Sequence, residues 1–183
     1  MPPACRGGGD GEEKAVLEFP LLLLFPAAML YAAVMDFFTM TIPNKISVAL
    51  VVGFVAVALL AGVSWQVFLD HVGAGVLVLA ISIFMFACGW FGGGDAKLLS
   101  AAALWFGFDQ LLDYTLLVTI LGGLLAVFIM AYRQMVPPMW ISGLGWAERL
   151  YDQKAGIPYG LALAGAGLWL FPTSQIFLMH VAA

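Results

Sequence analysis

Residues 92–99 read Gly-Gly-Gly-Asp-Ala-Lys-Leu-Leu, and long apolar stretches surround this short polar segment. The 20 residues before it, 72–91, carry no charge, and the 11 residues at 98–108 carry none either. A transmembrane helix needs about 20 apolar residues, so the first of these stretches is long enough to span a bilayer. Asp95 and Lys97 therefore lie in a turn at one membrane surface, between two helices.

The same pattern of uncharged stretches continues in both directions from this turn. Four further stretches carry no charge, namely 19–35, 46–69, 114–132 and 155–179. Of the 183 residues, 63% are hydrophobic and 10% are charged, whereas a soluble domain averages about 25% charged residues. The sequence therefore predicts an all-α membrane protein with about six transmembrane helices in a single bundle. Its formal charge of −4 and the lack of a basic block argue against nucleic-acid binding.

The stretch 98–108 is too short for an ordinary span. If its helix begins with Asp95 as the N-cap, it contains 14 residues and reaches about 21 Å. The hydrocarbon core of a bilayer is about 30 Å thick. We expect a short fourth helix, with a locally thinned bilayer or with Asp109 near the far interface. A re-entrant segment is the alternative.

The charges between the stretches orient the bundle. With six spans and the N-terminus outside, the cytoplasmic side holds most of the basic residues: Lys45, Lys97, Arg133, Arg149 and Lys154. The outer side holds only Arg6 and Lys14, as expected if positive charge gathers on the cytoplasmic side. We expect residues 1–18 to form a disordered N-terminal tail and residues 19–183 to form the membrane domain.

Two acidic residues lie at helix ends on the same predicted side of the membrane. Asp36 follows the first apolar stretch, and Asp95 precedes the fourth. An ionisable side chain at the edge of a span is costly and is therefore a functional hypothesis. Two neighbouring carboxylates repel each other, so such a pair holds one proton; the ionised acid then activates water and the protonated acid binds a peptide carbonyl oxygen. Helix capping is the competing explanation for Asp95.

Several motifs together resemble those of the type IV prepilin peptidase family. Residues 92–99 resemble its Gly-x-Gly-Asp signature, which continues x-Lys-Leu. Asp36, followed after five residues by Ile42-Pro43-Asn44, resembles its first catalytic motif, and residues 157–160 resemble a further family segment. The resemblance implies an aspartic membrane protease whose peptidase domain covers 19–183.

The resemblance also assigns roles to individual residues. Asp36 and Asp95 would be the catalytic aspartates, without any metal ion or cofactor. The residues that would shape the loop or contact the substrate are Gly92, Gly94, Lys97, Pro43 and Asn44. Lys97 has two alternative roles: it biases the nearby carboxylates toward ionisation, or it anchors its helix among lipid headgroups.

A function follows from the resemblance. The substrate would be a type IV prepilin with a short basic leader and one hydrophobic helix, cleaved at the cytoplasmic face of the bacterial inner membrane. Longer family members carry two zinc-binding Cys-x-x-Cys pairs and also methylate the new N-terminus. This chain has two cysteines in all and resembles the short form of tight-adherence (Flp) pilus systems, so we expect no methyl transfer.

Other readings stay open. The two acids could bind an ion or a proton in a small transporter, or the chain could be a noncatalytic pilus-assembly subunit. Presenilin-like proteases share Gly-x-Gly-Asp but place their first Asp after a Tyr, whereas Met35 precedes Asp36 here. We expect residues 133–156 to form an interfacial stretch or a mobile flap. His71 and His180 are predicted to be plain interfacial residues on the other side.

Overall fold

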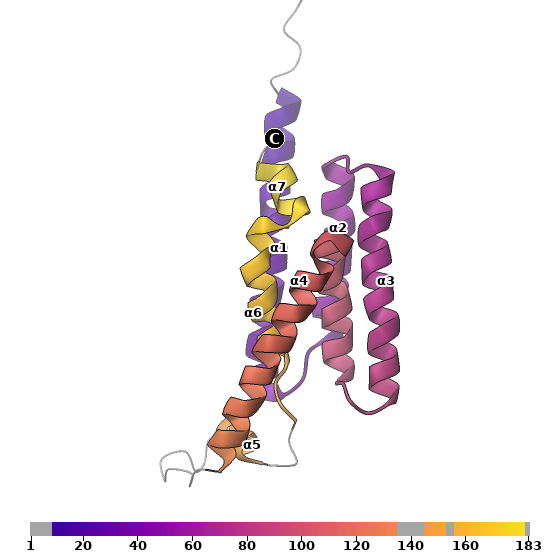
Figure 1. The fold of residues 1–183 in the computed structure, drawn as a ribbon. Helices are drawn as coiled ribbons and strands as arrows, with labels where there is room; N and C mark the ends of the chain where they lie inside the picture. The colour runs from indigo at the N-terminus through magenta and orange to yellow at the C-terminus, as the bar shows by residue number, and fades with distance from the viewer. Residues whose placement is uncertain (1–8, 135–144, 153–155, 182–183) are drawn as a thin grey trace, which may run out of the picture.

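The computed structural model describes residues 9–134, 145–152 and 156–181, and within these ranges the chain is helical, with no strand. The elements are α1 (Gly9–Thr39), α2 (Asn44–Leu60), α3 (Trp65–Ala87), α4 (Gly93–Arg133), α5 (Gly145–Tyr151), α6 (Gly160–Leu170), the 3-10 helix η1 (Phe171–Thr173) and α7 (Gln175–Val181). Figure 1 shows the long helices running up and down a single bundle. The predicted all-α architecture is confirmed.

Four helices among the described residues are long and apolar enough to cross a membrane, and α2 is a shorter apolar helix. The four qualifying segments are Leu22–Thr39, Trp65–Ala87, Gly93–Arg133 and Gly160–Met179. The third of them, α4, contains both the fourth and the fifth predicted helix. The structure is therefore that of a membrane-spanning helical bundle, in which one long bent helix replaces two predicted ones.

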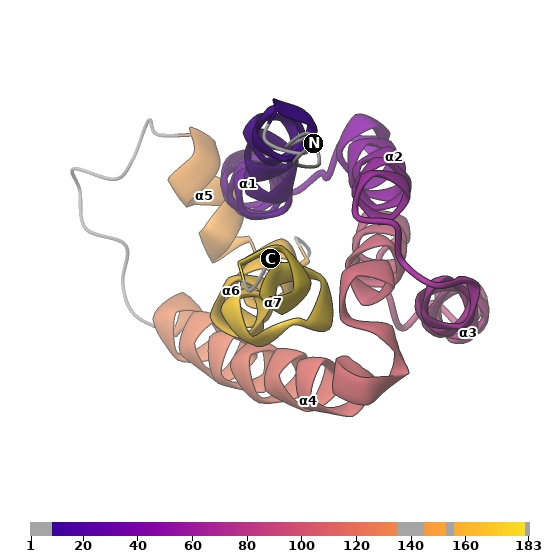
Figure 2. The ribbon, with the colours of Figure 1, turned by 90° about the horizontal axis from the view of Figure 1, so that it is seen from above.

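The bend in α4 lies at Gly107. There the backbone leaves the helical conformation (φ 63°, ψ −174°), in a region that is essentially restricted to glycine. The carboxylate of Asp70 on α3 accepts a hydrogen bond from the amide of Phe108 at 3.0 Å, which holds the bend. Figures 1 and 2 show the first leg of α4 (93–106) running beside α2 and α3, and the second leg (108–133) running beside α6. The first leg is the predicted short fourth helix.

Aromatic side chains fill the core between α1, α2, the first leg of α4 and α6. Phe25 of α1 stacks on Phe171 of η1, with ring centroids 4.6 Å apart, and also contacts Trp105 at 5.2 Å. The indole N–H of Trp105 donates to the carbonyl oxygen of Leu50 at 3.1 Å, which satisfies its only polar group inside the bundle. These contacts set the positions of the helices that carry the acidic residues.

Two helix boundaries differ from those predicted. Helix α1 begins at Gly9, inside the segment 1–18 that we expected to be disordered; residues 1–8 lie outside the described residues. Most of residues 12–18 are ordinary helix formers, which is compatible with this early start. The last predicted span, 155–179, is divided into α6, η1 and α7, because Pro172 lies in the 3-10 turn and cannot donate a helical hydrogen bond.

His71 is not the interfacial residue that we predicted. Its side chain is fully buried and stacks on Phe54, with ring centroids 5.5 Å apart. Its Nδ1–H donates to the carbonyl oxygen of Leu104 at 2.7 Å, and its Nε2 lies 3.4 Å from Oε1 of Gln175. The imidazole therefore joins α3, α4 and α7 near the bend. The side chain of His180 lies outside the described residues.

Candidate active site

The two aspartates lie at the same end of the bundle. Asp36 is in the last turn of α1, and Asp95 is in the first turn of α4. In Figure 1 both of these helix ends, together with the starts of α2 and α6, are at the lower end of the molecule. We call this the site end. The bend of α4 and the start of α3 lie at the opposite end.

The carboxylate of Asp36 is buried and held by the start of α6. The side chain is 5% exposed, and its Oδ2 accepts a hydrogen bond from the amide of Gly160 at 2.7 Å. A Cβ added to Gly160 would lie 2.8 Å from both Cβ and Oδ2 of Asp36. Only glycine leaves room for this approach, so residue 160 determines where the carboxylate lies.

Asp95 is half-buried and is not the N-cap of its helix, which was the explanation that competed with a catalytic role. Helix α4 begins at Gly93, its N-cap is Gly92, and no side chain makes a capping hydrogen bond there. The helix begins two residues before Asp95, so this acid lies inside the first turn and not at the cap position. Within the described part of the chain, the carboxylate of Asp95 has no hydrogen-bond partner. The capping explanation for this acid is thus not supported.

The two carboxyl groups act on each other. The negative charge of Asp36 acts unfavourably on that of Asp95, so the two side chains lie in the same neighbourhood at the site end. Oδ2 of Asp95 also lies against Gly92, where an added Cβ would be only 2.6 Å away. The predicted pair is therefore together in space, although its members are far apart in the sequence.

The other predicted site residues join the two loops at this end. A Cβ on Gly94 would lie 3.2 Å from Cβ of Ile42, so the glycine run packs tightly against the linker after α1. Lys97 donates to Oδ1 of Asn44 at 2.9 Å, which connects α4 to α2. Asn44 is the first residue of α2, and Pro43 occupies the N-cap position before it.

The linker after α1 begins with a strained residue. Met40 has a positive φ of 54°, which residues other than glycine and asparagine rarely adopt. Its amide donates to the carbonyl oxygen of Asp36 at 2.8 Å, and this bond ends the helix. The strain lies directly after the helical turn that carries Asp36.

Basic residues gather around the site end. In the described residues they are Lys45, Lys97, Arg133 and Arg149. Arg133 donates from Nε to the carbonyl oxygen of Leu150 at 2.8 Å and from Nη2 to that of Gly156 at 3.0 Å. These bonds fasten the described parts of the predicted 133–156 loop to the end of α4. Residues 135–144 and 153–155 of that loop lie outside the described residues.

Sequence reasoning missed the specific role of Gly160. The sequence placed this residue only in the segment 157–160 that resembles the family. The small residues Gly160, Ala162 and Ala164 pack inside the bundle, but nothing in this series distinguishes the residue that donates to Asp36. Only the contact between α1 and α6 identifies it.

The fold and this site define a polytopic membrane protein with a pair of neighbouring carboxyl groups at one end of its helical bundle. The model of the type IV leader peptidase family matches residues 23–127, which is more than half of the chain and includes both aspartates. The chain belongs to the type IV leader peptidase family. Membership of this family implies a peptidase that acts on a protein substrate. No significant match to a curated protein or to a solved structure was found.

Proposed function

We propose that the chain is an aspartic endopeptidase that removes the basic leader peptide from type IV prepilins of the tight-adherence (Flp) kind. Asp36 and Asp95 are its catalytic residues in this proposal. The observation that best supports it is the meeting of these two acids, one from α1 and one from α4, close enough to repel each other. Their meeting at the end of the bundle, and not midway along it, favours a peptidase over a transporter.

The proposed reaction needs only the two carboxyl groups and a water molecule. The ionised carboxylate accepts a proton from the water as the water oxygen attacks the scissile carbonyl carbon. The protonated carboxyl group donates a hydrogen bond to the carbonyl oxygen and stabilises the negative charge that develops there. When the C–N bond breaks, the proton taken from the water passes to the leaving amine. The amide of Gly160 keeps Asp36 oriented throughout.

The surroundings of the pair suit a peptide substrate. An extended backbone near the membrane needs a protein surface or a wet cavity to satisfy its polar groups. Gly92 is exposed and lies against the carboxylate of Asp95, so a substrate backbone that reaches Gly92 also reaches that acid. Pro43 and Asn44 border the same loop. The end of the bundle, unlike its middle, is also within reach of water.

We place the site end on the cytoplasmic side of a bacterial inner membrane. The four described basic residues near the site end support this orientation, because positive residues concentrate in cytoplasmic segments. The N-terminus would then lie outside. A basic leader made in the cytoplasm would meet the aspartates, while the hydrophobic helix of the prepilin stays in the bilayer.

A cleavage assay in membranes tests the proposal. The native chain is compared with Asp36→Asn and Asp95→Asn at equal expression, using the prepilins encoded alongside it. Each substitution keeps the side-chain shape but removes an ionisable carboxyl group, so we expect a loss of cleavage of at least about 1,000-fold. Asp70→Asn is the matched control at the opposite end and should cleave normally once folded.

Two results would reject this function. If either Asp36→Asn or Asp95→Asn cleaves at the native rate, that residue is structural and the site is wrongly assigned. If the native chain cleaves none of these prepilins, the transporter and assembly-subunit alternatives become the better explanations.

A further inference from the structure

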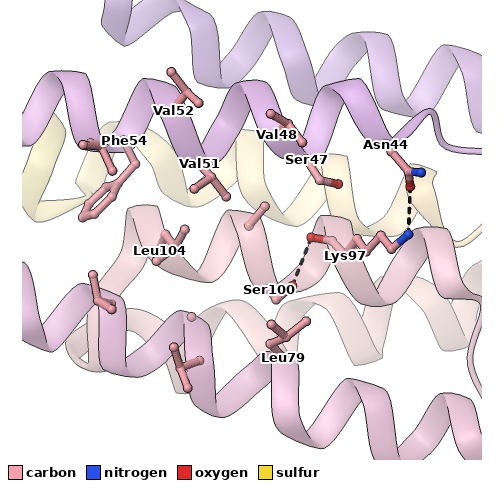
Figure 3. A pocket seen from close by; sticks show the side chains of 15 residues that line it. Asn44, Ser47, Val48, Val51, Val52, Phe54, Leu79, Lys97, Ser100 and Leu104 are labelled. Atoms are coloured by element: carbon pink, nitrogen blue, oxygen red, sulfur yellow. Dashed lines mark hydrogen bonds between the residues drawn. The ribbon is translucent and has the colours of Figure 1, made fainter.

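A groove runs along the bundle between α2 and α3. It encloses a cavity of about 560 Å³ that begins beside Asn44 and Lys97 and extends along α2 to Val55 (Figure 3). Its walls are mostly valines, including Val51 of α2 and Val76 of α3, and the first leg of α4 forms its floor. Val51 and Val76 are exposed, so the groove faces the lipid and not the core.

The groove exists because α2 and α3 make few contacts with each other, although a short turn joins them. Helix α3 packs mainly against α4, and α2 packs against α1 and α4. Gly75 permits the close approach of α3 to α4, since an added Cβ would lie 2.6 Å from Cδ2 of Leu104. The first leg of α4 therefore lies between two helices that stand apart, with one long side uncovered.

One buried polar group in the groove has no partner among the described residues. Ser47 is 8% exposed, lines the cavity, and its Oγ makes no hydrogen bond with any described residue. A buried hydroxyl without a partner is destabilising by about 1–3 kcal/mol. An acyl chain has no group that could pair with this hydroxyl. A peptide helix could satisfy it through a polar side chain.

The floor of the groove is also suited to a helix. It carries the small residues Ser100 and Ala101 of α4, and small residues let transmembrane helices approach closely. The polar end of the groove, formed by Asn44 and Lys97, is at the site end (Figure 3). The end of the groove at Lys97 is thus only two residues from Asp95 in α4, so a helix bound in the groove would end close to this acid.

We propose that this groove receives the apolar transmembrane helix of the peptide substrate, an inference that rests on the peptidase function proposed above. The bound helix lies between α2 and α3 on the first leg of α4, and a polar side chain in its first turns pairs with Ser47. The segment that precedes this helix passes Asn44 and Lys97 and crosses the glycine run toward Asp95. The groove therefore selects substrates that continue into a membrane helix after the cleavage site.

Photocrosslinking tests where the substrate helix lies. A benzophenone amino acid replaces Val51 or Val76 in the groove, or Val127 on the lipid-exposed second leg of α4 as the control. The chain also carries Asp95→Asn, so that a labelled prepilin stays uncleaved. We expect crosslinks to the prepilin at Val51 and Val76, at least tenfold stronger than at Val127. Equal crosslinking at all three positions, or crosslinks only to lipid or to a second copy of the chain, would overturn the proposal.

Filling the groove gives a second, kinetic test. Val51→Trp is compared with Val127→Trp, using the full prepilin and a short peptide that spans the cleavage site without the apolar helix. We expect Val51→Trp to lower kcat/KM for the prepilin relative to that for the peptide by at least tenfold, while Val127→Trp leaves this ratio unchanged. An equal ratio in both variants would contradict groove binding.

Replacing Ser47 separates a binding role from a structural one. Ser47→Ala removes an unpaired hydroxyl, so the thermal stability of the free chain should stay the same or rise, whereas KM for the prepilin should increase about threefold or more. An unchanged KM would overturn the pairing. If the native chain cleaves the prepilin but no groove variant behaves as expected, only the docking site is wrong; if it cleaves nothing, the peptidase function fails as well.

Discussion

The two ends of the bundle use their acidic residues differently. At the opposite end, the carboxylate of Asp70 accepts a hydrogen bond from the amide of Phe108. The neighbouring His71 donates a hydrogen bond to the carbonyl oxygen of Leu104. At the site end, Asp36 is held by the amide of Gly160, but Asp95 beside it has no hydrogen-bond partner among the described residues. One acid shapes a turn, whereas the other two form a repelling pair. The comparison suggests that acids left incompletely paired by the fold are those available to a substrate.

The contrast also has an exception at the opposite end. Oε1 of Gln110 is buried and has no hydrogen-bond partner in the part of the chain that the structure describes, although Nε2 of the same side chain donates to the carbonyl oxygen of Thr173 at 3.0 Å. The side-chain amide of Gln110 therefore still connects α4 to η1 through its remaining hydrogen bond. An unpaired polar atom is therefore informative only where a cavity or a second charged group adjoins it, as at Ser47 and Asp95.

The largest stability effect should come from the opposite end. In Gly107→Ala the new Cβ would meet Oδ2 of Asp70 at 2.9 Å, in a backbone conformation that alanine tolerates poorly. We expect the free energy of unfolding in detergent to fall by about 3 kcal/mol, with normal cleavage by the chains that stay folded. Gly123→Ala on the same helix is the control and should not destabilise, because no described residue outside the helix's own backbone comes within 4 Å of the new Cβ. If Gly107→Ala lost cleavage without losing stability, the bend at the opposite end would affect catalysis at the site end.

The corresponding glycine at the site end should affect activity more than stability. Gly160→Ala would push the Asp36 carboxylate away from its amide donor, which should reduce kcat about 30-fold, equivalent to about 2 kcal/mol. Gly165→Ala on the same helix is the matched control, because its nearest neighbour, Cδ1 of Leu121, is at an ordinary 3.5 Å. Cleavage kinetics of both variants in membranes measure the difference. Native kcat in Gly160→Ala would show that the position of Asp36 is not critical.

The smallest effect should come from the strained residue after α1. Met40→Gly relieves the positive φ of 54°, so it should raise the free energy of unfolding by about 0.5–1 kcal/mol. Met40→Ala keeps the strain and should show no such gain. Thermal unfolding of both variants makes the comparison. If the glycine variant is less stable than the native chain, the contacts of the Met40 side chain stabilise the fold by more than its positive φ destabilises it.

The helical bundle could be predicted because it follows from uncharged stretches and from the charges between them. The same pattern placed Asp36 and Asp95 at the ends of helices on one side, where the structure has them. The helices follow from the local sequence, and the shared side of the two acids follows from the number of spans between them. A long apolar stretch has few alternatives to a membrane helix, so these inferences needed no tertiary information.

The helix boundaries could be predicted less well. We expected a break near Asp109, but the charged residue lies within the second leg of α4 and the bend is at Gly107. The bend depends on Asp70 and His71 from another helix, and no local pattern contains that contact. N-capping was the competing explanation for Asp95 because Asp is a common cap, whereas α4 begins two residues earlier, with Gly92 as its N-cap. The donor to Asp36 likewise comes from a distant helix.

The measurement that tests the catalytic pair most directly is the binding of a substrate analogue whose scissile amide is replaced by a carbon bearing a hydroxyl group. That hydroxyl mimics the tetrahedral intermediate and would lie between Asp36 and Asp95. We predict that the native chain binds it at least about 100-fold more tightly than the matched analogue without the hydroxyl. The preference should disappear in both Asp36→Asn and Asp95→Asn. Equal affinity of the native chain for the two analogues would contradict the account.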